Sequence, residues 1–201
     1  MKILTLNAHG LLEEKWKVFV DAIILEKPDI IALQTIWNME TLIEMLKKRG
    51  MEYCFEYEKG VGLMSLSPIL ETSTKRVGEN GSIIGICTEK EPDQWLFNVC
   101  YDERESFFTQ WQKTKEYVEP LKCSWLLGEF YNPVNIRDEG YDEMCYDGWK
   151  DCYLFAGEGK IAGKAWFKSK KIINDYRVIF DGTNYSDVCD YMGIIVEADN
   201  M

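Results

Sequence analysis

The stretch that decides the fold is SWLLGEFYNP, which runs from Ser124 to Pro133. Ser124 to Leu127 has the composition of a buried strand, and Gly128 ends this run. Glu129 follows where the strand opens into a loop, and Pro133 stops further pairing because it has no N–H group. A carboxylate at such a strand end is a frequent catalytic or metal-binding group in layered α/β folds. A solvated strand end has the same pattern, so spacing alone leaves both interpretations of Glu129 open.

Composition indicates one soluble domain over residues 1–201. Hydrophobic residues make up 46% of the chain, enough for one sizeable core, and charged residues make up 28%. The formal net charge is -11, so the surface repels phosphate backbones and anionic lipid. No apolar run approaches the length of a membrane span. Nucleic acid is therefore an unlikely partner, and no membrane association is expected.

Cysteine and histidine usage indicates a cytoplasmic protein. The seven cysteines are odd in number and form no C-x-x-C motif, so we expect reduced thiols rather than a disulfide framework or a structural zinc site. The N-terminal MKILTLNAHG is not typical of a signal peptide. His9 is the only histidine, and its position in the first loop favours a hydrogen-bonded loop residue over a catalyst.

Hydrophobic periodicity predicts a mixed α/β domain with layered sheets. Helices are expected at about Glu13–Glu26, Asn38–Arg49, Phe107–Val118 and Tyr141–Tyr146. Strands are expected at Lys2–Asn7, Asp29–Gln34, Tyr53–Glu58, Gly62–Leu66, Ile69–Arg76, Ser82–Thr88, Gln94–Tyr101, Ala165–Phe167, Asp175–Phe180 and Gly193–Val196, besides the strand that ends at Gly128. Glu91 to Asp93 has the composition of a turn, and Lys168, Lys170 and Lys171 are typical of a solvated strand end.

An ordered set of segments resembles the endonuclease/exonuclease/phosphatase superfamily, which includes deoxyribonuclease I. The segments are MKILTLN, PDIIALQ, GVGLMSLSPI, WLFNV, LLGEFYNP and DYMGIIVE, and together they cover nearly the whole chain. The resemblance is strongest to a bacterial branch with sugar-phosphate phosphatases. It implies a four-layer α/β sandwich, with two packed mixed or antiparallel sheets and helices outside. It also implies metal-dependent hydrolysis of phosphoesters at the strand ends.

Three functional positions of that family are retained or nearly retained. Asn7 ends the first strand, as a site asparagine does in the family, and Asp190 matches the aspartate of its closing motif. Glu129 stands at the position of an aspartate, one methylene longer. The resemblance makes these three residues the candidate metal ligands. Because one carboxylate is lost and another is lengthened, we expect Mg²⁺ or Mn²⁺ to bind weakly.

Four other family positions are substituted. Thr35 stands where a metal-binding glutamate is expected, and Tyr131 replaces an asparagine. Cys100 and Tyr191 stand where the two catalytic histidines are expected. Phosphoester hydrolysis needs a polarised water and stabilisation of charge on the phosphoryl oxygens, so these substitutions predict a low rate.

The sequence leaves three functions open. The first is a catalytically inactive relative that acts as a binding or interaction protein, with a small phosphorylated ligand or an unknown protein as partner. The second is a Mg²⁺-dependent phosphatase of a small phosphorylated compound, such as a sugar phosphate, with a remodelled site. The third is a zinc site built from Cys100, Cys189, His9, Glu129 and Asp190. Thiols that fill space left by lost side chains explain the two cysteines more simply.

Overall fold

The computed structural model describes residues 1–9, 11–102, 104–129, 139–156, 165–168, 171–183, 185–186 and 188–200. Within the stretch Ser124–Pro133 it describes the chain as far as Glu129. The predicted site residue Tyr131 and the side chain of Glu129 lie outside this description.

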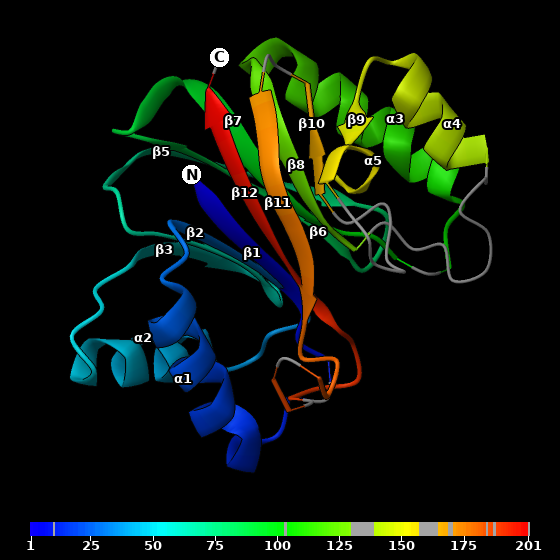
Figure 1. Ribbon diagram of the computed structural model, residues 1–201. Coiled ribbons are helices and arrows are strands. Elements are labelled where there is room, and N and C mark those ends of the chain that lie inside the picture. Colours follow the sequence, from blue (N-terminus) through cyan, green and yellow to red (C-terminus); the bar gives the residue numbers. More distant parts are fainter. Residues whose placement is uncertain are drawn as a thin grey trace.

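The described residues form two sheets of six strands each (Figure 1). In spatial order, the first sheet contains β11 (Lys171–Ile179), β12 (Gly193–Asn200), β1 (Lys2–Asn7), β2 (Ile30–Gln34), β4 (Val61–Ser65) and β3 (Cys54–Glu58). The second contains β5 (Ile69–Val77), β6 (Gly81–Thr88), β7 (Glu91–Cys100), β8 (Cys123–Glu129), β10 (Ala165–Phe167) and β9 (Lys150–Asp151). Strands β1 and β2 pair in parallel, as do β7 and β8, and every other described pair is antiparallel.

Helices cover the outer face of each sheet (Figure 1). On the first sheet lie α1 (Trp16–Glu26), which follows the 3-10 turn η1 (Glu13–Lys15), and α2 (Met39–Lys48). On the second lie α3 (Phe107–Val118), which continues into the 3-10 turn η2 (Glu119–Leu121), and α4 (Glu139–Tyr146). The short helix α5 (Tyr153–Ala156) lies near β9 and β11. No helix in the described part of the chain is long and apolar enough to cross a membrane.

Alternating side chains of the central strands fill different cores. In β1, Leu4 and Leu6 pack among α1 and α2, whereas Ile3 packs between the two sheets. In β8, Leu126 packs under α3, whereas Trp125 and Leu127 lie between the sheets. Because central strands such as β1, β2 and β8 are buried on both faces, their sequences are nearly continuous apolar runs. The predicted four-layer α/β sandwich is confirmed.

Gly128 shows why the stretch Ser124–Pro133 permits this architecture. Its φ of 136° lies in a region that residues with a side chain rarely adopt. A Cβ atom on Gly128 would also lie 2.0 Å from the backbone oxygen of Val99 in the neighbouring strand β7. Only glycine therefore allows β8 to stay paired with β7 up to Glu129, where the strand ends.

The turn predicted at Glu91–Asp93 was wrong, because β7 already begins at Glu91. The turn lies two residues earlier, at Glu89 and Lys90. The ladder between β6 and β7 shifts register there, since Thr88 pairs with Glu91 and Cys87 pairs with Trp95. The three residues from Pro92 to Gln94 form a bulge, which tolerates a residue without an N–H group.

The predicted solvation of Lys171 was also wrong. Its side chain is 2% exposed and donates to both carboxylate oxygens of Glu91, at 3.0 and 3.2 Å. The Lys171 ammonium also lies 5.9 Å from the ring centroid of Trp125. β11 begins at Lys171 rather than at Asp175, and this buried ion pair joins its first residue to β7.

Candidate functional site

The site is built where the strands of both sheets end. Parallel pairing of β1 with β2 places Asn7 beside Gln34, and parallel pairing of β7 with β8 places Cys100 beside Glu129. The carboxyl ends of parallel strands point to the same edge of a sheet, which is where layered α/β folds bind ligands.

A buried polar network joins the two sheets below the site. The side-chain amide of Gln34 donates to the Asn98 carbonyl oxygen at 2.7 Å and to Thr5 Oγ1 at 3.2 Å. Asn98 in turn donates to the backbone oxygens of Leu33 and Gly62, at 2.9 and 2.8 Å. Gln34 is 1% exposed and Asn98 is fully buried, so a broken bond here would leave an unpaired polar group. The network therefore fixes the strand ends of one sheet against those of the other.

Thr35 holds Asn7 from the end of β2. Its hydroxyl donates to Asn7 Oδ1 at 2.6 Å, and its backbone is left-handed, with a φ of 55°. This conformation is strained for a β-branched residue and costs about 1–3 kcal/mol. The next residue stabilises it, because the Ile36 N–H group donates to the Gly60 oxygen at 2.9 Å.

His9 lies against Asp190, and the two residues join the loop after β1 to the segment before β12. His9 Nδ1 is 2.8 Å from Asp190 Oδ2, and the Asp190 N–H group donates to the His9 oxygen at 3.1 Å. The His9 N–H group donates to Asn7 Oδ1 at 3.1 Å. Both side chains remain more than half exposed. The only imidazole of the chain is therefore held in the site with its second ring nitrogen, Nε2, available to a ligand.

Asn7 is oriented by these contacts. A backbone N–H group and a hydroxyl both donate to its Oδ1 atom, which occupies the two lone pairs of that oxygen. The Asn7 side chain is thereby fixed so that its amide NH₂ group, a donor, is the part left for a ligand. Cys189 adds a contact from the other side, with Sγ 3.3 Å from the Asn7 backbone oxygen.

An open pocket of about 350 Å³ lies over these residues. It is lined by Asn7, His9, Thr35, Asn80, Tyr101, Asp102, Arg104 and Tyr191. Its volume is within the range of small-molecule sites. The first four of these residues carry polar groups on exposed loops or strand ends, and Arg104 adds an exposed guanidinium.

Asp102 organises the Arg104 side of the pocket. Its carboxylate accepts the N–H group of Arg104 at 3.0 Å and both the backbone and side-chain N–H groups of Asn80 at 3.1 Å. These donors lower the pKa of Asp102, and the Arg104 N–H group has the largest effect. The carboxylate thus stays ionised and is engaged by the N–H groups of Arg104 and Asn80, while Arg104 itself is exposed.

The structure brings together most of the predicted site residues. Asn7, Thr35 and Tyr191 line the pocket, and Asp190 is joined to it through His9. Cys100 ends β7 at the same edge, but its side chain packs against the core between the sheets.

Sequence reasoning missed Asn80, Tyr101, Asp102 and Arg104, and it gave His9 a lesser role. Tyr101 and Asp102 directly follow β7. Polar residues at the end of a predicted strand are a signal that could have identified them. Asn80 lies in the turn between β5 and β6, and no local pattern connects it to the site.

A divalent ion fits the described ligand set poorly. Both lone pairs of Asn7 Oδ1 are engaged, and one carboxylate oxygen of Asp190 is hydrogen-bonded to His9. Among the described residues, no three or more His, Cys, Asp or Glu side chains are grouped so that they could hold a metal. Mg²⁺ usually needs one or two free carboxylates, so His9 and Thr35 would have to release these oxygens first.

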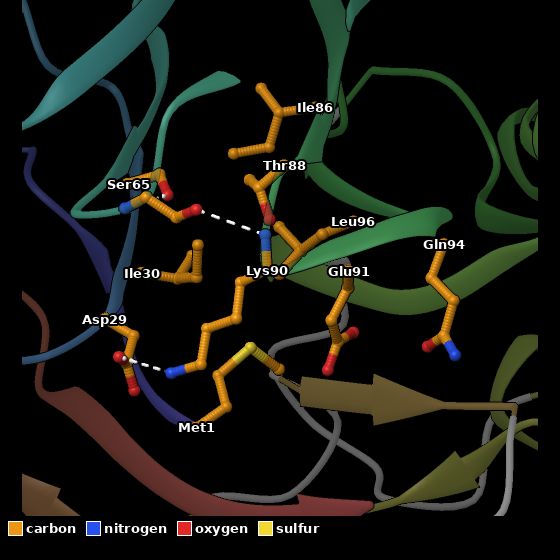
Figure 2. A pocket seen from close by; sticks show the side chains of 11 residues that line it. Met1, Asp29, Ile30, Ser65, Ile86, Thr88, Lys90, Glu91, Gln94 and Leu96 are labelled. Carbon is orange, nitrogen blue, oxygen red and sulfur yellow. Dashed lines mark hydrogen bonds and ion pairs between the residues drawn. The ribbon is translucent and has the colours of Figure 1, made fainter. Parts of the chain in front are cut away.

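The other cavities differ from this pocket. Figure 2 shows one at the opposite strand ends, where Lys90 pairs with Asp29 at 2.8 Å beside Met1. Its volume of about 30 Å³ suits a water molecule rather than a ligand. A third cavity, of about 430 Å³, lies at the start of β8, where Lys168 stacks over Trp149 and pairs with Glu119 at 3.8 Å.

Comparisons with known proteins place this site in a familiar fold. No protein-family model and no curated protein matches the chain. Solved structures do match it. An endonuclease/exonuclease/phosphatase family protein from Leptotrichia buccalis has a TM-score of 0.81 and 20% identity, with 99% of both chains covered.

Two Bacteroides thetaiotaomicron proteins are similar as well. A family protein has a TM-score of 0.76 and 13% identity over 100% of this chain and 98% of its own. A mannosyl-6-phosphatase has a TM-score of 0.72 and 14% identity over 99% of both chains. At these identities the likeness concerns the architecture, and the chain therefore has the deoxyribonuclease I-like fold of endonuclease/exonuclease/phosphatase family proteins.

Proposed function

We propose that the chain is a binding or interaction protein that holds a small phosphorylated compound in the strand-end pocket and hydrolyses it negligibly. One observation carries this proposal: Asn7 and His9 are fixed by hydrogen bonds in a pocket that also contains Arg104. An amide NH₂ and a guanidinium are donors suited to phosphoryl oxygens. Because Nδ1 of His9 donates to Asp190, its Nε2 donates to a phosphoryl oxygen only as an imidazolium, and as a neutral ring it accepts from a phosphoryl O–H group.

The charge of the pocket agrees with a small anion rather than a polyanion. Asp102 and Asp190 lie beside the donors, but hydrogen bonds to Asn80, Arg104 and His9 engage their carboxylates. The whole chain has a net charge of -11, which opposes the approach of nucleic acid. The mannosyl-6-phosphatase with the same fold acts, by its name, on a phosphorylated small molecule. A small phosphorylated ligand is therefore the ligand class that we propose.

Negligible hydrolysis follows from the substituted positions. Loss of one general acid–base group typically costs about 10²–10⁴ in rate. Cys100 and Tyr191 stand where the resemblance predicts two imidazoles, and the structure packs Cys100 against the core. Thr35 offers no charge to a metal and instead holds Asn7 Oδ1. Weak binding of Mg²⁺ or Mn²⁺ stays part of this proposal.

The binding test uses methylphosphonate, because its C–P bond is not a phosphoester. Titration calorimetry of the protein should show saturable binding that is independent of added Mg²⁺. Arg104→Ala should weaken it about tenfold, as expected for the loss of one charge-assisted hydrogen bond. Arg49→Ala is the matched control, because Arg49, directly after α2, pairs with Asp21 of α1, outside the pocket. Absence of binding, or equal effects of the two variants, would contradict the proposal.

The catalytic test measures turnover of phosphomonoesters with Mg²⁺. We expect a rate far below about 1 s⁻¹, an ordinary enzymatic value. The combined variant Thr35→Glu, Cys100→His, Glu129→Asp, Tyr131→Asn and Tyr191→His should gain activity. Wild-type turnover at about 1 s⁻¹ or faster would refute the inactive assignment.

One observation favours a second function, a Mg²⁺-dependent phosphatase of a sugar phosphate or similar compound with a remodelled site. The His9–Asp190 pair provides an imidazole held by a carboxylate, a common arrangement in acid–base catalysis. This function requires measurable turnover that is lost in both Asp190→Asn and His9→Gln. Turnover that survives in both variants would exclude it.

A further inference from the structure

Trp37 is a large apolar side chain that the fold leaves in solvent beside the pocket. It is 70% exposed, whereas five of the other six tryptophans are buried: Trp16, Trp111, Trp125, Trp149 and Trp166. It follows Thr35, a lining residue of the pocket, by two positions. The face of the indole ring is therefore accessible to a ligand.

The loop that carries Trp37 is fixed on both sides. Ile36 is 2% exposed, its N–H group donates to Gly60, and its oxygen accepts the Tyr57 hydroxyl at 3.0 Å. Met39, at the start of α2, is fully buried. Trp37 is thus presented by a rigid segment, which reduces the entropy lost when a ligand stacks on it.

The end of the indole ring lies near Gly60, which also neighbours the backbone of Thr35. A Cβ atom placed on Gly60 would be 3.8 Å from Trp37 Cη2 and 3.7 Å from the Cα atom of Thr35. The end of the indole ring and the backbone of Thr35 therefore both lie next to Gly60, in the turn between β3 and β4. A ligand whose phosphoryl group is bound near Asn7 could extend over Thr35 to this ring.

Two further apolar side chains are exposed close in sequence to lining residues of the pocket. Leu12 is 57% exposed in the loop that follows His9, and Met192 is 44% exposed directly after Tyr191. Polar donors thus form the floor of the site, while exposed apolar side chains follow three of its lining residues in the sequence. This arrangement matches a ligand with an anionic end and an apolar body.

We propose that Trp37 is a stacking platform that makes the pocket selective for phosphorylated compounds with an aromatic ring. The inference rests on the proposed function, because it assumes that the phosphoryl end is bound by the pocket. Offset stacking of two aromatic rings adds to the gain from buried area. Phosphorylated compounds without a ring would still bind, but more weakly.

The test compares phenylphosphonate with methylphosphonate, which share the anionic group and differ in the ring. Calorimetry should show that the wild type binds phenylphosphonate about tenfold more tightly. Trp37→Ala should abolish this preference and leave the affinity for methylphosphonate unchanged. Trp37→Phe should retain most of it. Tyr146→Ala is the matched control, because Tyr146 is 90% exposed on α4 and does not line the pocket.

The outcomes separate this inference from the proposed function. Equal affinity of the wild type for both phosphonates, or a preference that survives in Trp37→Ala, would overturn the stacking platform while the phosphate site stands. Equal weakening of both ligands in Trp37→Ala would also overturn it, because Trp37 would then support the loop rather than contact the ring. Failure of both phosphonates to bind would refute the two proposals together.

Discussion

Replacement of Gly128 by alanine tests the structural origin of the site directly. Gly128 adopts a φ of 136°, and a Cβ atom there would lie 2.0 Å from the Val99 oxygen and 2.9 Å from the Val99 carbon and nitrogen. Alanine would therefore introduce backbone strain and would force β8 away from β7. The Gly128→Ala variant should lose stability because the parallel pairing at Val99 and Cys100 must open.

The magnitude has two parts. A residue with a side chain in this backbone region costs about 1–3 kcal/mol. Each backbone hydrogen bond lost when the two strands separate costs about 0.5–1.5 kcal/mol more. We therefore expect a loss of about 3–5 kcal/mol in the free energy of unfolding, a large share of the total stability of an ordinary domain.

Gly50→Ala is the matched control. Gly50 also has a positive φ, of 80°, but nothing lies within 4 Å of a Cβ atom placed there. Its substitution should cost only about 1 kcal/mol. Urea unfolding of the two variants and the wild type gives both values. We attribute the need for glycine at position 128 to the close approach of Val99 and not to backbone conformation alone. If Gly128→Ala and Gly50→Ala lost the same unfolding free energy within about 0.5 kcal/mol, this explanation would be refuted.

Two further predictions concern ion pairs outside the pocket. Glu91→Gln should lower the free energy of unfolding, measured in urea, by about 3 kcal/mol, because it removes the carboxylate paired with the 2%-exposed side chain of Lys171. In the double variant Glu91→Gln with Lys171→Met, most of that stability should be restored. An equal loss in the single and double variants would contradict this. The pKa of Glu26 is lowered from 4.5 to about 2, and hydrogen bonds from Arg177 are the largest cause. A carboxyl group whose pKa is lower in the folded than in the unfolded state stabilises the protein at pH values above its unfolded-state pKa. Up to about 3 kcal/mol of the free energy of unfolding should therefore be lost as the pH falls from about 4.5 towards 2. Unfolding free energies measured across this range should fall less steeply for Glu26→Gln, and parallel curves would refute the assignment.

The sequence predicted the layers of the fold because their signals are local. Continuous apolar runs such as Ile30–Gln34 and helical spacing such as that of Trp16 to Glu26 mark strands and helices within a few residues. β9 and α5 were not predicted, since two-residue and four-residue elements contain too little pattern.

Features that depend on distant partners were not predictable. Lys171 is buried in an ion pair with Glu91, 80 residues away in the sequence. The His9 imidazole is held in the site by Asp190, at a separation of 181 residues. A single sequence carries no local signal for either pairing, whereas Asn7 and Asp190 were identified through the resemblance to a family.

The most direct test of the proposed phosphate site uses the only histidine of the chain. In protein labelled with ¹⁵N-histidine, the imidazole signals belong to His9 alone. Titration with methylphosphonate should shift the Nε2 signal saturably and leave the Nδ1 signal, which reports the bond to Asp190, nearly unchanged. An Nε2 signal that does not respond at any concentration would contradict the proposal that His9 binds the phosphoryl group of the ligand.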